Sequence, residues 1–190
     1  MPCMDDDALR RGKPTVHVKF GQASALLAGD ALQAQAFLVL TDGAGDADCK
    51  LAMVRLLAQA SGSLGMCGGQ AIDLASVGLR LSRQQLEQMH RLKTGSSLRA
   101  SVLLGALSGK LLTITEEQAL DRYAAAVGLA FQVVDDILDA TADSATLGKT
   151  AGKDAADNKP TYVSILGLDA SKALAEQLRQ DAHAAILSFG

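Results

Sequence analysis

Hydrophobic residues along this chain follow a helical pattern and not an alternating one. Alanine and leucine dominate, and valine, isoleucine, threonine and aromatic residues nowhere gather into runs with a period of two. Only three prolines interrupt the sequence. Propensity and period therefore both favour helix throughout. We predict an all-α protein with short connections and with helices at residues 22–41, 50–77, 83–109, 116–142 and 170–188.

Two sequence signals mark helix starts. Ser82-Arg83-Gln84-Gln85 fits a capping box, in which the first and fourth side chains each bond the backbone N–H of the other residue. Leu81 and Leu86 are placed around it as a hydrophobic staple. Thr115-Glu116-Glu117-Gln118 is a second pattern of this kind.

The helix predicted at residues 50–77 contains Gly62, Gly65, Gly68 and Gly69. Each glycine costs up to about 1 kcal/mol of helix propensity relative to alanine, so something must offset that cost. Close crossing of helices in a tight bundle would do so, and so would a ligand that passes near this backbone. A phosphate-binding glycine loop is not predicted, because no strand precedes the segment and the G-x-G-x-x-G spacing is absent.

The composition narrows the class of protein. The 190 residues are 48% hydrophobic and 3% aromatic, and the formal net charge is −3, which fits one globular domain with an aliphatic core. No global basic field is present to attract nucleic acid, and no apolar run reaches the roughly 18 residues of a membrane helix. The N-terminus lacks the pattern of a secretion signal, and the three cysteines are widely spaced. We expect a cytoplasmic protein with free, mostly buried thiols and no nucleic-acid or membrane partner.

Three carboxylates lie at an unfavourable place near the end of the fourth predicted helix. Asp135, Asp136 and Asp139 follow a nearly apolar stretch. Like charges at i and i+4 destabilise a helix by about 0.2–0.5 kcal/mol, and the helix dipole disfavours an exposed negative charge here by about 0.3–1 kcal/mol. A bound cation would offset these costs, and oxygen donors without Cys or His favour Mg²⁺ over zinc. The alternative is a solvated acidic helix end that pairs with Lys149 or Lys153.

A second acidic run, Asp5-Asp6-Asp7, is followed closely by Arg10 and Arg11. By itself, this pattern is typical of a solvated turn that neutralises its own charge. Together with the Asp135 cluster, it suggests carboxylates for a metal ion and guanidinium groups for phosphate, since planar arginine donors bind phosphate oxygens bidentately.

Lys93 occupies an inward position of its predicted helix, seven residues after Leu86. A cation on an apolar face needs an anion, or it must extend its stem along the surface to reach solvent. With Thr94 beside it, Lys93 could instead reach into a central cavity. A long polar connection at residues 143–160 also stands out, because loops of that length in compact domains are usually functional or disordered.

Motifs in several parts of the chain resemble those of the trans-polyprenyl diphosphate synthases, and in detail those of the bacterial farnesyl (geranyl) diphosphate synthase branch. The stretch Phe131-Gln132 followed by Asp135-Asp136-Ile137-Leu138-Asp139 resembles the second aspartate-rich region of that family. The other segments that carry the resemblance are residues 4–17, 64–70, 90–95, 147–149 and 158–159.

The resemblance implies a helical bundle around a deep central cavity, assembled as a homodimer. It implies Mg²⁺ ions that bridge two aspartate-rich regions and an allylic diphosphate. The implied chemistry is ionisation of the allylic C–O bond, attack of the isopentenyl double bond on the resulting cation, and loss of a proton. The implied substrates are isopentenyl diphosphate and dimethylallyl or geranyl diphosphate, and the implied product is farnesyl diphosphate.

The resemblance also implies a role for individual residues of this sequence. The implied metal ligands are carboxylates, namely Asp5, Asp135, Asp136 and Asp139. The implied partners of the departing diphosphate are lysines, namely Lys93, Lys149 and Lys159. The groups implied around the substrates are Thr94 and Gln132 near the carbocation, Arg10 for the allylic diphosphate, Gln70 for the allylic pocket, and Arg11 for isopentenyl diphosphate.

The chain departs from the family pattern at its N-terminus. Of the first aspartate-rich motif, D-D-x-x-x-x-D, only Asp5 is present. We expect residues 1–190 to form a single prenyl synthase domain that lacks N-terminal helices and the extreme C-terminus, as a fragment or a truncated gene product would.

Three hypotheses follow from these observations. The first is a Mg²⁺-dependent prenyltransferase. The second is a non-catalytic helical partner that keeps the fold without the full metal cluster. The third is a helical scaffold whose aspartates are surface groups, for which Asp135→Ala would not alter ligand binding. If helices that normally cover the inner face are absent, apolar stripes that include Leu26, Leu27 and Leu38 would face water and drive association, so we expect poor solubility or obligate oligomerisation.

Overall fold

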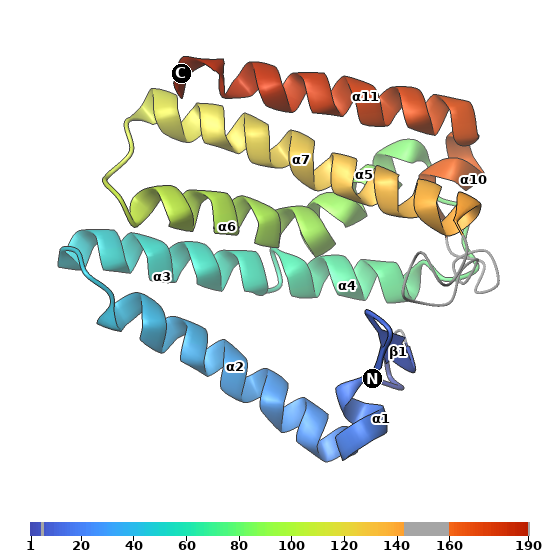
Figure 1. The fold of residues 1–190 in the computed structure, drawn as a ribbon, viewed down its shortest axis with the longest axis horizontal. Coiled ribbons are helices and arrows are strands. Elements are labelled where there is room, and N and C mark those ends of the chain that lie inside the picture. The colour runs from blue at the N-terminus through green and yellow to red at the C-terminus, as the bar shows by residue number, and fades with distance from the viewer. Residues whose placement is uncertain (5, 143–159, 190) are drawn as a thin grey trace.

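The computed structural model describes residues 1–4, 6–142 and 160–189, and it is almost entirely helical (Figure 1). The prediction of an all-α protein is confirmed. The elements are β1 (Leu9–Arg10), β2 (Lys13–Pro14), α1 (Val16–Phe20), α2 (Gln22–Asp42), α3 (Ala47–Ser61), α4 (Met66–Ala75), α5 (Arg83–His90), the π-helical turn η1 (Arg91–Gly95), α6 (Ser96–Leu107), α7 (Ile114–Thr141), α10 (Tyr162–Leu166), α11 (Leu168–Ala185) and the 3₁₀ turn η2 (Leu187–Phe189).

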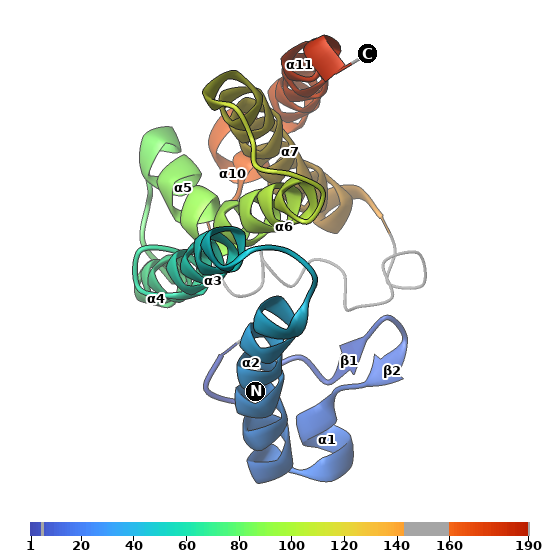
Figure 2. The ribbon, with the colours of Figure 1, turned by 90° about the vertical axis from the view of Figure 1, so that its left-hand side faces the viewer.

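The long helices stack side by side. The coaxial pair α3 and α4 is followed by α6, then α7 and then α11, and the short helices α5 and α10 pack at one end (Figure 1). Figure 2 shows the same stack from its end, with α2, α1 and the hairpin on one side of it. The contacts between α7 and α11 are the most extensive between any two described elements. The aspartate-bearing helix α7 therefore lies between α6 and α11.

The helix predicted at residues 50–77 is two helices, and the glycines explain why. The chain leaves α3 at Gly62 and enters α4 after Gly65. A Cβ on Gly65 would overlap the carbonyl of Ala60, and a Cβ on Gly68 would overlap the carbonyl oxygen of Ser63. The backbone thus folds on itself too tightly here for any other residue, which the prediction of one continuous helix missed.

The helix predicted at residues 83–109 begins as expected but is not uniform. The capping box of Ser82 and Gln85 is present, with the Ser82 N–H donating to Gln85 Oε1 over 2.9 Å. Its middle, η1, is wound as a π-helix. Single π turns of this kind are rare and occur frequently at functional sites.

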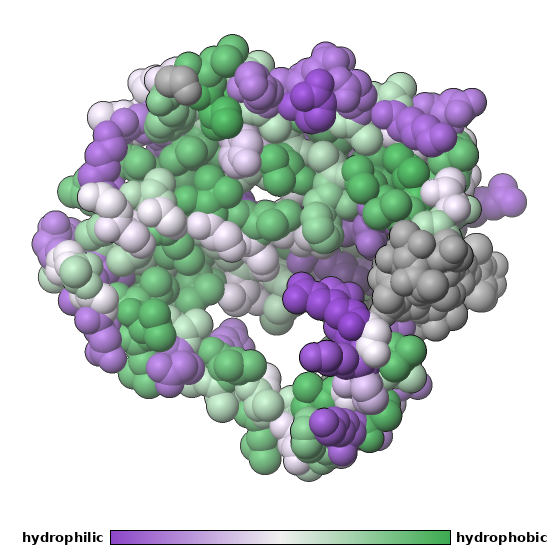
Figure 3. All heavy atoms as spheres, viewed as in Figure 1, coloured by the Kyte–Doolittle hydropathy of each residue, from purple (hydrophilic) through white to green (hydrophobic). Residues whose placement is uncertain are grey.

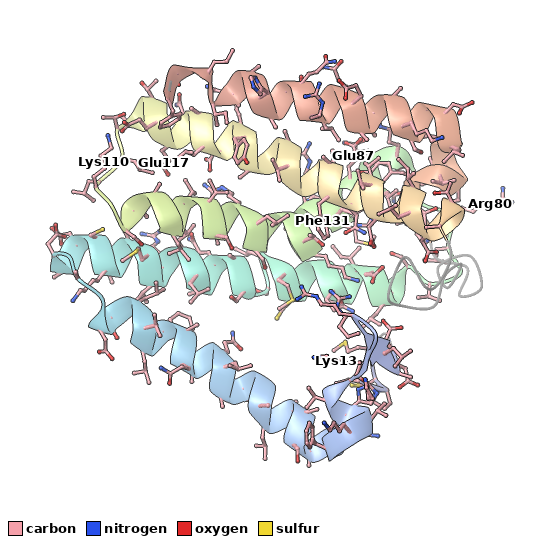
Figure 4. All side chains as sticks on the ribbon, in the orientation of Figure 1. Lys13, Arg80, Glu87, Lys110, Glu117 and Phe131 are labelled. Carbon is pink, nitrogen blue, oxygen red and sulfur yellow. The ribbon has the colours of Figure 1, made fainter. Side chains whose placement is uncertain are left out.

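The start of α7 is set by Thr113 and not by Thr115. Both threonines fit the capping pattern, but Glu116 closes the box with Thr113, whose N–H donates to Glu116 Oε2 over 2.9 Å. Lys110 donates to the other oxygen of Glu116 over 2.6 Å. The Lys110 hydrogen bond is the main cause that lowers the pKa of Glu116 to about 2. Lys110 lies at the turn between α6 and α7, at the opposite end of the bundle from α10 (Figure 4).

A hydrophobic cluster fixes the aspartate-bearing end of α7. Its buried members come from α5, α7, α10 and α11, and they are Leu86, Met89, Leu129, Val133, Tyr162 and Leu178. Tyr162 and Leu86 are completely buried.

All three cysteines are free as expected, but Cys49 alone is buried, whereas Cys3 and Cys67 are exposed.

The helix α2 has no buried residue. Leu26, Leu27 and Leu38 are all more than half exposed, as the sequence predicts. Within the described residues α2 is also long and apolar enough to cross a membrane, so the expectation that no segment reaches this length was wrong. A single helix of this kind near the N-terminus is weak evidence for a membrane span.

Candidate functional site

The aspartates at the C-terminal end of α7 have different surroundings. Asp136 is 4% exposed, and its Oδ2 accepts the backbone N–H of Tyr162 over 2.7 Å, which ties the first turn of α10 to α7. Asp135 is half-buried and lines a groove of about 800 Å³ between α7 and α11. Asp139 is buried one turn further along α7, on the same face as Asp135 because of the i, i+4 spacing.

The i, i+4 spacing places Asp135 and Asp139 on one face of α7, where they could hold a hard metal ion. Among residues 1–4, 6–142 and 160–189, no three His, Cys, Asp or Glu side chains are placed together to hold a metal ion. Mg²⁺ usually takes one or two protein carboxylates, because waters and substrate phosphates complete its octahedron. Asp135 and Asp139 could supply such donors, and their role as ligands stays a prediction. One oxygen of Asp136 is engaged with α10, and the role of Asp136 as a ligand stays a prediction. Asp5 lies outside the described residues.

The groove beside Asp135 is apolar. Phe131, Val134 and Leu138 line it and are 57%, 42% and 41% exposed. Figure 3 shows hydrophobic side chains gathered on this face of the bundle, and Figure 4 shows Phe131 on it. A carboxylate at the edge of an exposed hydrocarbon surface suits a ligand with a charged head and an apolar tail.

Lys93 has a carboxylate partner that the sequence did not reveal. Its Nζ donates to Oδ2 of Asp73, on α4, over 2.6 Å. The side chain of Asp73 is 8% exposed and that of Lys93 is 26% exposed. The expectation that this cation needs an anion is therefore met from within the protein. The signal that could have found Asp73 is a lone charge between Ile72 and Leu74 in an apolar helix.

Thr94 and Gln132 are hydrogen-bonded to each other, and their roles at the site stay predictions. Thr94 Oγ1 donates to Gln132 Oε1 over 3.1 Å, which joins η1 to α7. The two backbones approach closely nearby, since a Cβ on Gly128 would lie 3.1 Å from the Cα of Gly95. The π turn thus lies against α7, next to the helix end that carries the aspartates.

The remaining predicted site residues lie on the hairpin, on α4 or outside the described residues. Arg10 and Arg11 are exposed on the hairpin of β1 and β2, which the sequence did not predict. Arg11 and Gly12 both have positive φ, 53° and 72°, as in the type I′ turn that closes two-residue hairpins. Gln70 lies on α4 and contacts the N-terminal segment, with Nε2 at 3.7 Å from Met4 Sδ. Lys149 and Lys159 lie outside the described residues.

His90 is a buried histidine next to this group. Its ring stacks on Tyr162 with centroids 5.7 Å apart, and neither ring nitrogen has a hydrogen-bond partner within the described chain. Burial is the main cause that lowers the pKa of His90 to about 4. Lys93 lowers it too, whereas Asp73 and Asp135 raise it. His90 is therefore neutral at pH 7, and charges from α4, η1 and α7 surround one imidazole.

We expect the protein to lose stability in mild acid because of His90. Its pKa is about 4 in the folded state against 6.5 when unperturbed, so the unfolded chain takes up the proton first as the pH falls. The contribution is fully present above about pH 6.5 and is lost towards pH 4, so urea unfolding at about pH 5 is expected to give a free energy roughly 2 kcal/mol lower than at about pH 7.5. His90→Phe keeps the stacked ring and removes this dependence. Equal pH slopes for both proteins would contradict the assignment.

The comparison with known protein families identifies the class to which this helical bundle belongs. The polyprenyl synthetase family model matches residues 3–185, and the chain belongs to this family. The resemblance that the motifs indicated is thereby confirmed.

Within this family, the chain is similar to farnesyl diphosphate synthases. It is 54% identical to a probable farnesyl diphosphate synthase of Sinorhizobium fredii, over 100% of this chain and 58% of that protein. It is 51% identical to the farnesyl diphosphate synthase of Escherichia coli, over 96% of this chain and 62% of that protein. The chain thus spans about three fifths of the curated relatives that it matches.

Solved structures give the same result. A geranyltransferase of Helicobacter pylori, complexed with magnesium and isoprenyl diphosphate, matches with a TM-score of 0.89 and 33% identity over 98% of this chain and 61% of that one. An FPP/GFPP synthase of Zymomonas mobilis matches with a TM-score of 0.87 and 40% identity over 100% of this chain and 64% of that one.

Proposed function

We propose that this chain carries out prenyl transfer, in which isopentenyl diphosphate condenses with dimethylallyl or geranyl diphosphate to give farnesyl diphosphate. The observation that carries the proposal is the meeting of η1 with α7. It brings Lys93, Thr94 and Gln132 to the helix end that bears Asp135, beside an apolar groove. The similarity to farnesyl diphosphate synthases, and to a geranyltransferase complexed with magnesium and isoprenyl diphosphate, supports the same substrates.

The first chemical step is ionisation of the allylic diphosphate, and cations near its bridging oxygen promote it. The allylic C–O bond breaks and its electron pair leaves with the diphosphate, so fixed positive charge at that oxygen stabilises the transition state. Asp135 and Asp139 would hold Mg²⁺, which would supply part of this charge when bound. Lys93 supplies another part, and we assign Lys149 and Lys159 to the same task.

The remaining groups bind and orient the reactants. The Thr94 hydroxyl and the Gln132 amide turn their dipoles towards the carbocation, and the Phe131 face of α7 receives the prenyl chain. The isopentenyl double bond then attacks the allylic cation, which leaves a new cationic carbon on the isopentenyl unit. A proton leaves the carbon next to that centre, and a double bond forms. Arg10 binds the allylic diphosphate with help from Gln70, and Arg11 binds isopentenyl diphosphate. Asp5 completes the metal region of the proposed site, and Asp136 supports it by binding the first turn of α10 to α7.

The test is a product assay with the whole chain. Incubation with MgCl₂, isopentenyl diphosphate and geranyl diphosphate is expected to release pyrophosphate and to form a fifteen-carbon product, which EDTA and Asp135→Ala abolish. A chain that binds Mg²⁺ and pyrophosphate but forms no product is the non-catalytic partner. A chain that binds neither would show that the aspartates are only surface groups and would contradict both functional proposals.

We also propose that the chain acts as a cytoplasmic homodimer. The exposed apolar residues of α2, which include Leu26, Leu27 and Leu32, form a surface of the kind that drives association. Sedimentation velocity is expected to show a dimer, and Leu27→Asp with Leu32→Asp is expected to shift it towards monomer. A sharp monomer peak for the unaltered chain would contradict this part of the proposal.

A further inference from the structure

The helix α4 contacts Lys93 at two points. Gly69 and Asp73 lie four residues apart, so they share one face of α4. A Cβ on Gly69 would overlap the backbone nitrogen of Lys93. The Asp73 carboxylate meets the ammonium at the other end of the same residue, over 2.6 Å. One face of α4 therefore fixes both the backbone and the charged end of Lys93.

Asp73 is buried, so its carboxylate needs the Lys93 ammonium as a partner. The residue is 6% exposed, and a buried carboxylate without a cation would be strongly unfavourable. The Lys93 side chain keeps 26% of its surface exposed. An ammonium group has three N–H donors, and one of them meets Asp73. Within the described residues the Lys93 ammonium makes no second hydrogen bond, so its other donors can bind an anion.

We propose that Asp73 is a positioning residue for diphosphate binding, which holds the Lys93 ammonium in place while its other donors bind the anion. The inference rests on the proposed function and adds a residue that the family resemblance did not assign. Thr94, the neighbour of Lys93, donates to Gln132 Oε1 over 3.1 Å, and Gln132 lies about one turn before Asp135 on α7. The pair is therefore near the aspartate end of α7, where the metal-bound diphosphate would lie.

A double-mutant cycle tests whether Asp73 acts through Lys93. Binding of inorganic pyrophosphate in the presence of MgCl₂ is measured by calorimetry for the unaltered chain, Asp73→Asn, Lys93→Gln and the double variant. Asparagine keeps the shape of aspartate and removes the charge. We expect Lys93→Gln to weaken binding by about 30-fold and Asp73→Asn by about 10-fold, since charged hydrogen bonds to a buried partner are strong. The double variant is expected to match Lys93→Gln within about twofold, because coupled residues are not additive.

A matched control comes from another ion pair of the bundle. Arg99 Nε and Asp121 Oδ1 are 2.7 Å apart, between α6 and α7, and both side chains are more than one third exposed. Asp121→Asn is expected to leave pyrophosphate affinity unchanged. A merely structural Asp73 would lower the melting temperature without changing the affinity, or its effect would multiply with that of Lys93→Gln, and either result would overturn the proposal.

A measurement on the unaltered chain covers the case in which Asp73→Asn does not fold. The ¹⁵Nζ resonance of Lys93 is expected to shift on addition of MgCl₂ and pyrophosphate, while the ¹³Cγ resonance of Asp73 keeps its chemical shift because the pair stays intact. A shift at Asp73 that shows release of the lysine would overturn the inference alone. If the unaltered chain binds no pyrophosphate, the proposed function falls together with it.

Discussion

Replacement of Gly69 by alanine is expected to destabilise the protein by about 3 kcal/mol, because overpacking against a rigid neighbour typically costs 1–3 kcal/mol and sometimes more. The new Cβ would overlap the backbone N and Cα of Lys93 and would lie 2.7 Å from the carbonyl carbon of Leu92. These are main-chain atoms, so no side-chain rotation relieves the contact. Urea unfolding followed by circular dichroism measures the loss.

Gly105→Ala is the matched control for this substitution. Gly105 lies inside α6, and a Cβ there would meet no atom within 4 Å. The variant is expected to gain about 0.4–1 kcal/mol, because alanine reduces the freedom of the unfolded chain. If both variants changed stability alike, the close approach of α4 to η1 would not exist in solution. Gly69→Ala is also expected to weaken pyrophosphate binding, since it displaces Lys93.

The substitutions Asp135→Ala and Asp136→Ala are expected to have opposite profiles, although the two residues are adjacent. Asp135 lines the groove and is a proposed metal ligand, so its loss is expected to weaken Mg²⁺-dependent pyrophosphate binding by about 100-fold, as removal of several kcal/mol of metal-mediated stabilisation would do. Asp136 accepts the N–H of Tyr162 in a buried site. Its loss leaves that donor unpaired and is expected to cost about 1–3 kcal/mol of folding free energy.

Two measurements on both variants separate these effects. Calorimetric titration with MgCl₂ and pyrophosphate gives the affinity, and urea unfolding without Mg²⁺ gives the stability. Asp136→Asn serves as the control, because its amide oxygen can still accept the Tyr162 N–H. If Asp136→Ala lost affinity as strongly as Asp135→Ala and kept full stability, the distinction between the two residues would be wrong.

The fold was largely predictable because its signals are local. The capping box of Ser82 and the apolar stretch before Asp135 lie within single helices, and both appear where the sequence places them. The start of α7 was predicted two residues late, at Thr115, because Thr113 and Thr115 both satisfy the capping pattern. Glu116 closes the capping box with Thr113 and also accepts a hydrogen bond from Lys110 across the turn.

What the sequence did not reveal depends on contacts between distant segments. The partner of Lys93 is Asp73, twenty residues earlier, and no periodicity links the two. The glycines of α4 were recognised as costly, and a close helix crossing was one of two explanations. That Gly69 lies on the backbone of Lys93 becomes visible only in three dimensions. The hairpin was missed because each of its strands has two residues, too few to show an alternating pattern.

The π turn at Arg91–Gly95 connects α5 to α6, and it sets how α6 is rotated about its own axis relative to α5. An α-helix advances about 100° per residue, and a π turn accommodates one extra residue per turn. Deletion of a single residue in η1 would therefore rotate every side chain of α6 by about 100° relative to α5, and Leu103 would leave the interior. Substitutions on the outer side of α6 leave this phase intact. Changes of length within η1 are thus far more damaging than changes of identity nearby, and homologous enzymes compared at this segment should align without gaps.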